Sequence, residues 1–411
     1  MTRIFFSVLL IWVTFSNLQA QQSTRKAVFI IVDGISYNTI EKIETPNLDE
    51  IARVGGYTRA YVGGEKGTYS QTPTISAVGY NSLLTGTWVN KHNVWDNRIQ
   101  QPNYNYWTIF RFFQSQYPHR KTAIFSTWLD NRTKLLGENL PQTGYLQVGY
   151  SFDGFELDSI RFPRDSESEY IRTIDELVST EAGNYIREQG PDLTWVYLQY
   201  TDDMGHKFGD SDQFHQAVKL ADSQVGKVWE AVKYRQQHFG EDWQIYITTD
   251  HGRDAQSGQN HGGQTDRERG TWIVTNAKNL NRQFRDNTPG VVDIMPSIAR
   301  HLDVTFPRLQ GYEVDGIPLF GELSFTNFSL AYQDKKIRLH WKSVAKDDQL
   351  KVWITTTNNF ETGGQDLYHL VQYVNCADET AVIDVSQMPS GFFKVVLEGK
   401  HNMANKWLVG K

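Results

Sequence analysis

Five short apolar runs separated by stretches of helical periodicity constrain the fold of this chain more than any other feature. The runs occupy residues 26–32 (KAVFIIV), 122–126, 195–200, 243–249 and 271–275. Continuous apolar runs of this length suit strands of a parallel sheet that is buried on both faces. Between them, residues 167–189 and 213–235 repeat apolar side chains on one helical face. The alternation predicts an α/β fold, with a doubly wound, mostly parallel sheet flanked by helices.

The pattern changes near residue 323. From there to the end of the 411-residue chain, short alternating strands are separated by turn-forming clusters, and no helical periodicity stands out. This spacing is typical of a small β-sandwich. We therefore expect residues 21–323 to form the large α/β domain and residues 324–411 a β-sandwich-like accessory domain.

The first twenty residues have the pattern of a signal peptide. Arg3 precedes an apolar stretch at 4–15, which is too short to cross a bilayer, and the small residue Ala20 follows. No later segment has the composition of a membrane span. We expect residues 1–20 to be a signal peptide and the protein to be exported to a periplasm or the extracellular space.

Net charge and cysteine content argue against a nucleic-acid-binding protein and against a fold held by disulfides. A net charge of -6 disfavours binding to a nucleic-acid duplex, which calls for a basic face. The single cysteine, Cys376, cannot form an internal disulfide, so the fold must rely on its core and on any bound metals. We expect Cys376 to be a buried, small apolar residue.

Acidic and histidine residues follow three of the expected strands. Asp33 comes directly after the first, Asp202 and His206 follow the third, and Asp250 and His251 follow the fourth. The carboxyl ends of parallel strands meet at one edge of the sheet, where ligands bind in such folds. Carboxylates and imidazoles together suit zinc or a similar divalent ion. His261, shortly downstream of His251, is a candidate for the last ligand.

These motifs resemble the alkaline phosphatase superfamily, and most closely its branch of type I phosphodiesterases and nucleotide pyrophosphatases. The strongest marks are Asp202-x-x-Gly-His206 and Asp250-His251-Gly. The branch also has a Pro-Thr-x-Thr segment that runs on to Thr-Gly, and residues 73–86 (PTISAVGYNSLLTG) align with it without a gap. The resemblance covers roughly residues 26–320, which makes 21–323 the expected catalytic domain.

The resemblance implies roles for individual residues. Ser76 falls on the nucleophile position, with serine in place of the usual threonine, and Asn97 falls on the asparagine that supports the transferred phosphoryl group. Two divalent metal ions, most simply Zn²⁺, are implied. The ligand sets that the resemblance implies are Asp202, His206 and His261 for one ion, and Asp33, Asp250, His251 and Ser76 for the other. A serine hydroxyl is a weak nucleophile at neutral pH, and coordination to a dication favours its alkoxide. Ser76 also begins an apolar-periodic stretch, which places it at a helix N-terminus, where backbone N–H groups favour phosphate.

Some features depart from the branch. Residues 77–80 (AVGY) replace its Phe-Pro-Asn-His, which puts a nucleotide preference in doubt. Related monoesterases carry a Lys-x-Arg pair after a later strand, and no such pair follows residues 122–126. Arg132 and Lys134 are either displaced substitutes or surface charges, and Trp128 either walls the substrate pocket or packs in the core.

The sequence therefore favours a phosphodiesterase or pyrophosphatase that works through a phosphoserine intermediate on a small-molecule or headgroup phosphate ester. A phosphomonoesterase of the same superfamily stays open. A sulfatase is disfavoured because Ser76 lacks the x-Pro-x-Arg that follows the sulfatase residue, and a phosphoglycerate mutase is disfavoured by the signal peptide. A non-catalytic binding protein that kept the fold is a further alternative. For the accessory domain, contact with carbohydrate, contact with the cell surface and a purely covering role are all open.

Overall fold

The computed structural model describes residues 24–410 of the chain. The expected signal peptide at residues 1–20 lies outside the described residues. Among the helices of the described part, none combines the length and the apolar composition needed to span a membrane.

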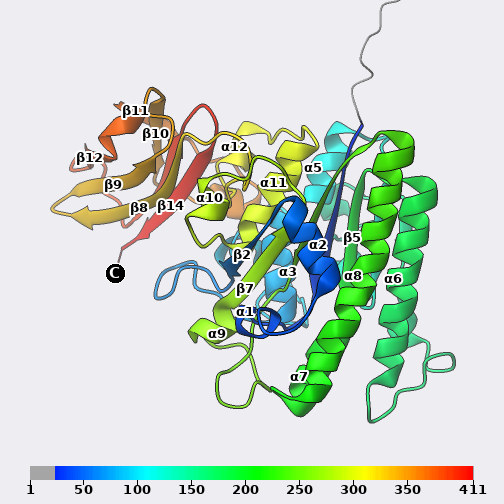
Figure 1. Cartoon of the computed structure of the whole chain (residues 1–411). Coiled ribbons are helices and arrows are strands. Elements are labelled where there is room, and N and C mark those ends of the chain that lie inside the picture. Colours follow the sequence, from blue (N-terminus) through cyan, green and yellow to red (C-terminus); the bar gives the residue numbers. More distant parts are fainter. Residues whose placement is uncertain (1–23, 411) are drawn as a thin grey trace, which may run out of the picture.

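A seven-stranded sheet forms the centre of the larger part of the molecule (Figure 1). Its strand order is β2-β7-β6-β1-β5-β3-β4. The strands are β1 (Arg25–Val32), β2 (Gly56–Tyr61), β3 (Thr122–Ser126), β4 (Tyr150–Phe152), β5 (Leu193–Leu198), β6 (Asp242–Thr248) and β7 (Gly270–Thr275). Pairing is parallel except where β7 meets β6 and β2. The predicted doubly wound, mostly parallel α/β fold is confirmed, and β2 and β4 are strands that the apolar runs did not reveal.

Both faces of the sheet are buried. Along β1, Ala27, Phe29 and Ile31 belong to one hydrophobic cluster, and Val28, Ile30 and Val32 belong to another. Side chains alternate between the two faces of a strand, so a continuous apolar run contributes to both clusters. This explains why β1 reads as an unbroken apolar run.

Helices cover the two faces. On one face α6 (Glu169–Gln189) and α8 (Asp212–Phe239) run side by side, with α2 (Pro46–Val54) and α7 (Tyr200–Phe208) packed against α8 (Figure 1). On the other face lie α3 (Ser76–Thr85), α5 (Ile109–Gln116) and α11 (Ile294–His301). The short helices are α1 (Tyr37–Ile40), α4 (Val89–His92), α9 (Asp266–Arg269), α10 (Arg282–Arg285) and α12 (Arg308–Gly311).

The carboxyl ends of β1, β5 and β6 bring the polar motifs to one edge of the sheet. β5 ends at Leu198, earlier than the run to Tyr200 predicted, because Tyr200 already begins α7. Asp202 and His206 therefore lie on a helix. The parallel registers of β1 with β5 and with β6 set the three strand ends beside one another.

The C-terminal part contains two antiparallel sheets. One has the order β11-β10-β13-β14 and the other β12-β9-β8. The strands are β8 (Phe325–Gln333), β9 (Lys336–Ser343), β10 (Gln349–Thr355), β11 (His369–Asn375), β12 (Thr380–Asp384), β13 (Phe392–Glu398) and β14 (Met403–Val409). Residues of both sheets share one hydrophobic core, which includes the buried Cys376. We call strands β8–β14 and their connections the C-terminal sheets.

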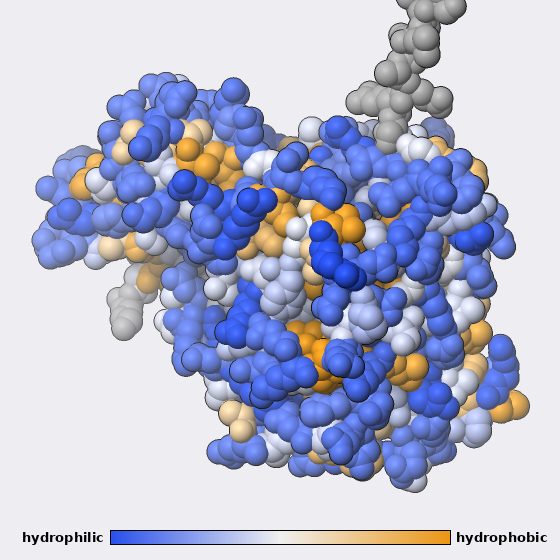
Figure 2. All heavy atoms as spheres, viewed as in Figure 1, coloured by the Kyte–Doolittle hydropathy of each residue, from blue (hydrophilic) through white to orange (hydrophobic). Residues whose placement is uncertain are grey.

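Hydrophilic residues cover most of the face drawn in Figure 2, and hydrophobic residues form smaller patches between them. The buried apolar side chains gather mainly in three large clusters, two around the central sheet and one in the C-terminal sheets, with a small fourth cluster around Trp88.

Candidate active site

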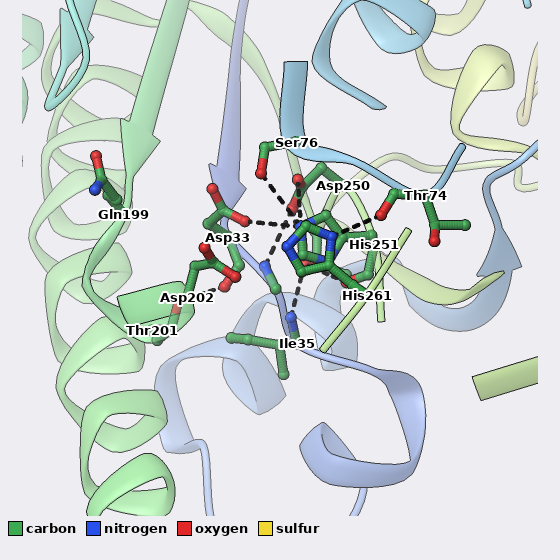
Figure 3. Close-up of polar contacts among 12 residues, drawn as sticks. Asp33, Ile35, Thr74, Ser76, Gln199, Thr201, Asp202, Asp250, His251 and His261 are labelled. Atoms are coloured by element: carbon green, nitrogen blue, oxygen red, sulfur yellow. Dashed lines mark hydrogen bonds and ion pairs between the residues drawn. The ribbon is translucent and has the colours of Figure 1, made fainter. Parts of the chain in front are cut away.

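Three residues that follow β1 and β6 form a first group of candidate metal ligands, which we call the first ligand group. The structure brings Asp33, Asp250 and His251 together, with one ligand atom of each within 4.8 Å of the others (Figure 3). The Nε2 atom of His251 lies 3.3 Å from Asp33 Oδ1 and 3.3 Å from Asp250 Oδ2. All three side chains are buried.

A second group lies next to the first. Asp202 and His206 are one helical turn apart on α7, so their side chains share a face, and His206 Nε2 lies 3.3 Å from Asp202 Oδ2. His261, from the loop after β6, brings its Nε2 atom 3.1 Å from that of His206. The ring of His261 also stacks on that of His251, with centroids 3.7 Å apart, so the two groups adjoin.

Backbone carbonyls orient the two stacked histidines. The Nδ1–H of His251 donates to the carbonyl of Gly252 at 2.9 Å, and that of His261 donates to the carbonyl of Thr74 at 2.8 Å. A hydrogen bond at Nδ1 fixes the tautomer that carries a lone pair on Nε2. Both Nε2 atoms are thereby left available to bind a metal ion.

Two carboxylate oxygens in the first group lie near His251 Nε2 but have no hydrogen-bond partner. Asp33 Oδ1 and Asp250 Oδ2 are buried and accept no hydrogen bond. A buried polar atom without a partner is costly unless a ligand satisfies it. Free oxygens beside a histidine Nε2 lone pair form a donor set that fits a divalent cation.

Two phenols hold the other oxygen of Asp33. Tyr80 and Tyr197 are both buried, and each donates a hydrogen bond to Asp33 Oδ2, from Tyr197 at 2.7 Å. The arrangement fixes the carboxylate and leaves Oδ1 directed at His251. Such supporting hydrogen bonds are a regular feature of metal ligands.

Burial and the closeness of several acidic side chains shift the pKa values of the site residues. Burial, reinforced by the charge of Asp33, raises the pKa of Asp250 well above its usual range. Burial alone would lower the pKa of His251, but Asp250 and Asp33 raise it to about 9. Burial lowers the pKa of His261 to about 4. The hydrogen bond to Asp202 raises the pKa of His206.

Arg253 provides a fixed positive charge at the centre of the site. Its fully buried guanidinium donates to Asp202 Oδ1, to the carbonyl of Asp202 at 2.8 Å and to that of Gly34 at 2.9 Å. Although burial opposes the effect, this charge lowers the pKa of Asp202. Gly205 makes room for it, because a Cβ at that position would lie 2.1 Å from the Arg253 Cζ atom.

Ser76 is the first residue of α3 and faces the first ligand group. Its Oγ atom lies 3.3 Å from His251 Nε2. Thr74 ties this loop to that of His261, since its hydroxyl donates to the carbonyl of Gly263 and accepts from the amide of Gly262, both at 2.9 Å. The helix can approach so closely because residue 79 is glycine, where a Cβ would lie 2.6 Å from the carbonyl oxygen of Asp250.

Asn97 contacts the first turn of α3, next to Ser76. Its Oδ1 atom accepts a hydrogen bond from the amide of Ala77 at 2.9 Å, and the side chain lines the cavity above the site. With Oδ1 engaged, the Nδ2 group is the free donor of the amide.

A cavity of about 300 Å³ opens over Ser76 and Asp33. Trp128 lines it, and its ring makes an edge contact with Tyr80 at 6.3 Å. Arg132 and Lys134 are not among its lining residues. Arg132 Nε binds Asp153 at 2.7 Å, and Lys134 Nζ binds Asp130 at 2.7 Å. Carboxylates beside their own helical segment thus hold both charges.

The sequence did not predict several of the residues that line the cavity. The far wall of the cavity includes Glu156, Arg164, Tyr170 and Gln199. No motif or spacing distinguishes them, because they come from a loop and from helix or strand ends brought together by the fold. Arg253 is different, since it directly follows the Asp250-His251-Gly motif and could have been singled out.

Comparison with protein families decides the membership of the chain. Residues 27–273 match the model of the type I phosphodiesterase / nucleotide pyrophosphatase family. The chain belongs to this family. The resemblance seen in the sequence motifs is thereby confirmed. The matched region contains Ser76, Asn97 and all six residues of the two ligand groups.

Curated relatives of this chain include ectonucleotide pyrophosphatase/phosphodiesterase family member 7 of Homo sapiens, 24% identical over 251 residues. That match covers 57% of this chain and 49% of the human protein. The Rattus norvegicus protein of the same name is 24% identical over 256 residues, covering 58% of this chain and 52% of the rat protein. The chain spans about half the length of the curated relatives it matches.

Solved structures support the fold. The crystal structure of Ps i-CgsB in complex with k-i-k-neocarrahexaose aligns with a TM-score of 0.51 at 16% identity, covering 79% of this chain and 85% of that one. At this identity the likeness concerns the fold, including the large α/β part.

Proposed function

We propose that this protein is a metal-dependent hydrolase of phosphoric diesters or pyrophosphates that uses Ser76 as its nucleophile. One observation carries the proposal. The Ser76 hydroxyl, at the N-terminus of α3, lies 3.3 Å from His251 Nε2, at the edge of two adjoining groups of metal-ligating side chains. Membership of a family of phosphodiesterases and pyrophosphatases supports the same reading.

The residues present fit two divalent ions. Asp202, His206 and His261 would hold one ion, and Asp33, Asp250 and His251, with Ser76, would hold the other. The unpartnered oxygens Asp33 Oδ1 and Asp250 Oδ2 and the mix of carboxylate and imidazole ligands favour zinc. Bound ions of this kind supply Lewis acidity, which favours the ionised serine and stabilises charge on ester oxygens.

The chemistry at Ser76 has two displacements. In the first, a bond forms between Ser76 Oγ and phosphorus while the bond from phosphorus to one ester oxygen breaks, and the first alcohol leaves with a proton. In the second, water attacks the phosphoryl serine, the Oγ–phosphorus bond breaks, and the monoester is released. Each step is an in-line displacement at phosphorus, so the nucleophile and the leaving group lie on opposite sides of the phosphorus atom.

Neutral donors around Ser76 would stabilise the charge that develops on the phosphoryl oxygens. Asn97 lines the cavity beside Ser76, and its Nδ2 group is the donor that Oδ1 leaves free. The N-terminus of α3, where Ser76 lies, adjoins the same space, and helix N-termini favour phosphate. Hydrogen-bond donors that are already fixed in position stabilise developing charge more strongly in such a site than water does.

The cavity favours a diester over a monoester. Among its lining residues in the described part of the chain, Arg164 is the only arginine or lysine. A monoester dianion carries more charge than a diester and calls for additional cations, and the charges of Arg132 and Lys134 are used elsewhere. Small-molecule or headgroup phosphate esters are the expected substrates.

We extend the proposal to the organisation of the chain. Residues 1–20 would direct export to a periplasm or the extracellular space, residues 21–323 would form the catalytic domain and residues 324–411 the accessory domain. The accessory domain is open to contact with carbohydrate or the cell surface.

The test compares a nitrophenyl phosphate monoester with the matching bis-ester, using zinc-loaded wild type, Ser76→Ala and chelator-treated wild type. We expect faster hydrolysis of the diester, and loss of activity in Ser76→Ala and after chelation. Equal activity in Ser76→Ala would overturn the role of Ser76. A strong monoester preference would replace the diesterase by a phosphomonoesterase, and the absence of any turnover would favour a binding protein.

A further inference from the structure

Residues 86–106 form most of the connection between α3 and α5, and Asn97 lies in the middle of this segment. Residues of the C-terminal sheets hold both of its ends. Neither contact belongs to the chemistry at Ser76, and the family match ends before the C-terminal sheets begin.

At the first end, Lys91 of α4 is completely buried. Its Nζ atom donates to Asp315 Oδ1 at 2.6 Å, to the carbonyl of Glu313 at 2.6 Å and to Asn405 Oδ1 on β14 at 2.8 Å. The ring of Trp407, also on β14, lies 5.3 Å from the same nitrogen. A buried ammonium needs all of these partners, because an unpaired charge in the interior is strongly destabilising.

A second buried lysine extends this contact into the C-terminal sheets. Lys394 of β13 binds Glu313 Oε1 at 2.7 Å and Asp366 Oδ2 at 2.8 Å. The hydroxyl of Tyr368 donates to the same Glu313 oxygen at 3.1 Å. Glu313, whose carbonyl accepts a hydrogen bond from Lys91, is thus itself held by Lys394 on β13 and by Tyr368 just before β11.

At the second end, two asparagine side chains bind one backbone atom. Asn103 Nδ2 and Asn105 Nδ2 donate to the carbonyl of Glu361, at 2.9 Å and 3.0 Å. Next to them the ring of Tyr106 packs on that of Phe360, with centroids 5.1 Å apart.

The stretch between the two ends is closed on itself. The amide of Asn103 donates to the carbonyl of His92 at 2.9 Å, and the amide of Val94 donates to His92 Nδ1 at 3.1 Å. From this closed loop the exposed Asn97 reaches the amide of Ala77, beside Ser76. Anchoring both ends limits the positions that Asn97 can take, which matters because a small displacement of a catalytic donor is costly in rate.

We propose that the C-terminal sheets position Asn97, and that Lys91, Asn103 and Asn105 are positioning residues for the reaction at Ser76. The inference rests on the proposed function. It gives the C-terminal sheets a part in catalysis that requires no ligand of their own.

The experiment measures diester hydrolysis by two variants, each made in the wild type and in the Asn97→Ala background. The partly exposed pair Asn103→Ala/Asn105→Ala removes one anchor, and Asn405→Ala removes the β14 partner of Lys91. The control is Asn287→Ala, which removes a different contact with the C-terminal sheets, the 3.1 Å hydrogen bond from Asn327. Hydrogen–deuterium exchange of residues 93–102 is followed in every protein.

In the wild type we expect each test variant to lower kcat by about tenfold, with KM changed less than about twofold, and to raise exchange of residues 93–102. In the Asn97→Ala background the same substitutions should lower kcat by less than about twofold, because the positioned group is already gone. The control should keep its kcat. Equal losses in both backgrounds, or unchanged kcat and exchange, would overturn the inference alone. A wild type without diesterase activity would overturn the proposed function and this inference with it.

Discussion

The two phenols on Asp33 give a prediction whose size follows from the geometry. Each phenol has one proton, and Tyr80 and Tyr197 both direct theirs at Oδ2 of this carboxylate. Tyr80→Phe removes one of the two donors. Loss of a supporting hydrogen bond to a metal ligand typically weakens metal binding about 10- to 100-fold. Because Tyr197 still donates to Asp33, we expect metal affinity to fall by the lower end of this range, about tenfold or roughly 1.4 kcal/mol.

The assay is a competition titration of metal-free protein with zinc and a chromophoric chelator. Asp33 belongs to only one ligand group, so one zinc should bind as in the wild type and the other about tenfold more weakly. The matched control is Tyr246→Phe, which removes a buried phenol on β6 that donates to Gln244 Oε1 at 2.9 Å. Unchanged zinc affinity in Tyr80→Phe, or an equal loss in Tyr246→Phe, would refute the reasoning.

Three further substitutions test other features. Gly79→Ala places a Cβ 2.6 Å from the carbonyl oxygen of Asp250, so we expect a loss of about 1–3 kcal/mol in unfolding free energy and a lower kcat, measured by urea denaturation and diester hydrolysis. Arg253→Met leaves the mostly buried Asp202 without its cation, and metal-free protein should lose roughly 3 kcal/mol, whereas unchanged stability would contradict the pairing. Burial raises the pKa of Asp293 to about 7, so the folded protein keeps a proton that the unfolded chain releases. Unfolding free energy should therefore fall as the pH rises from about 4 to about 7, and Asp293→Asn should reduce that slope; an unchanged slope would be the contrary result.

The sequence predicted the parts of the structure that local patterns determine. The apolar run of β1 identifies a strand buried on both faces, and Asp33 follows directly where that strand ends. Because parallel strands end at one edge, the grouping of Asp33 with Asp250 could be predicted without coordinates. The boundary of β5 was missed because Tyr200 has the side chain of a strand residue but begins α7.

Contacts between residues far apart in the sequence could not be predicted from local patterns. Arg132 could have faced the cavity, and only the fold shows that Asp153 and Glu138 hold its guanidinium. Tyr80, on α3, carries no signal of its own, because its partner Asp33 follows β1 and is distant in the sequence. The contact between Lys91 and Asn405 spans most of the chain and depends on how the C-terminal sheets pack, which no periodicity encodes.

The central claim is that Ser76 forms a covalent bond to phosphorus. It is tested most directly by acid-quenching the zinc-loaded enzyme during turnover of bis(nitrophenyl) phosphate and measuring the mass of the peptide that contains residue 76. The mechanism predicts a nitrophenyl phosphoryl adduct on Ser76 in the wild type, and neither adduct nor turnover in Ser76→Ala. Sustained turnover by Ser76→Ala, or an adduct on another residue of the wild type, would contradict it.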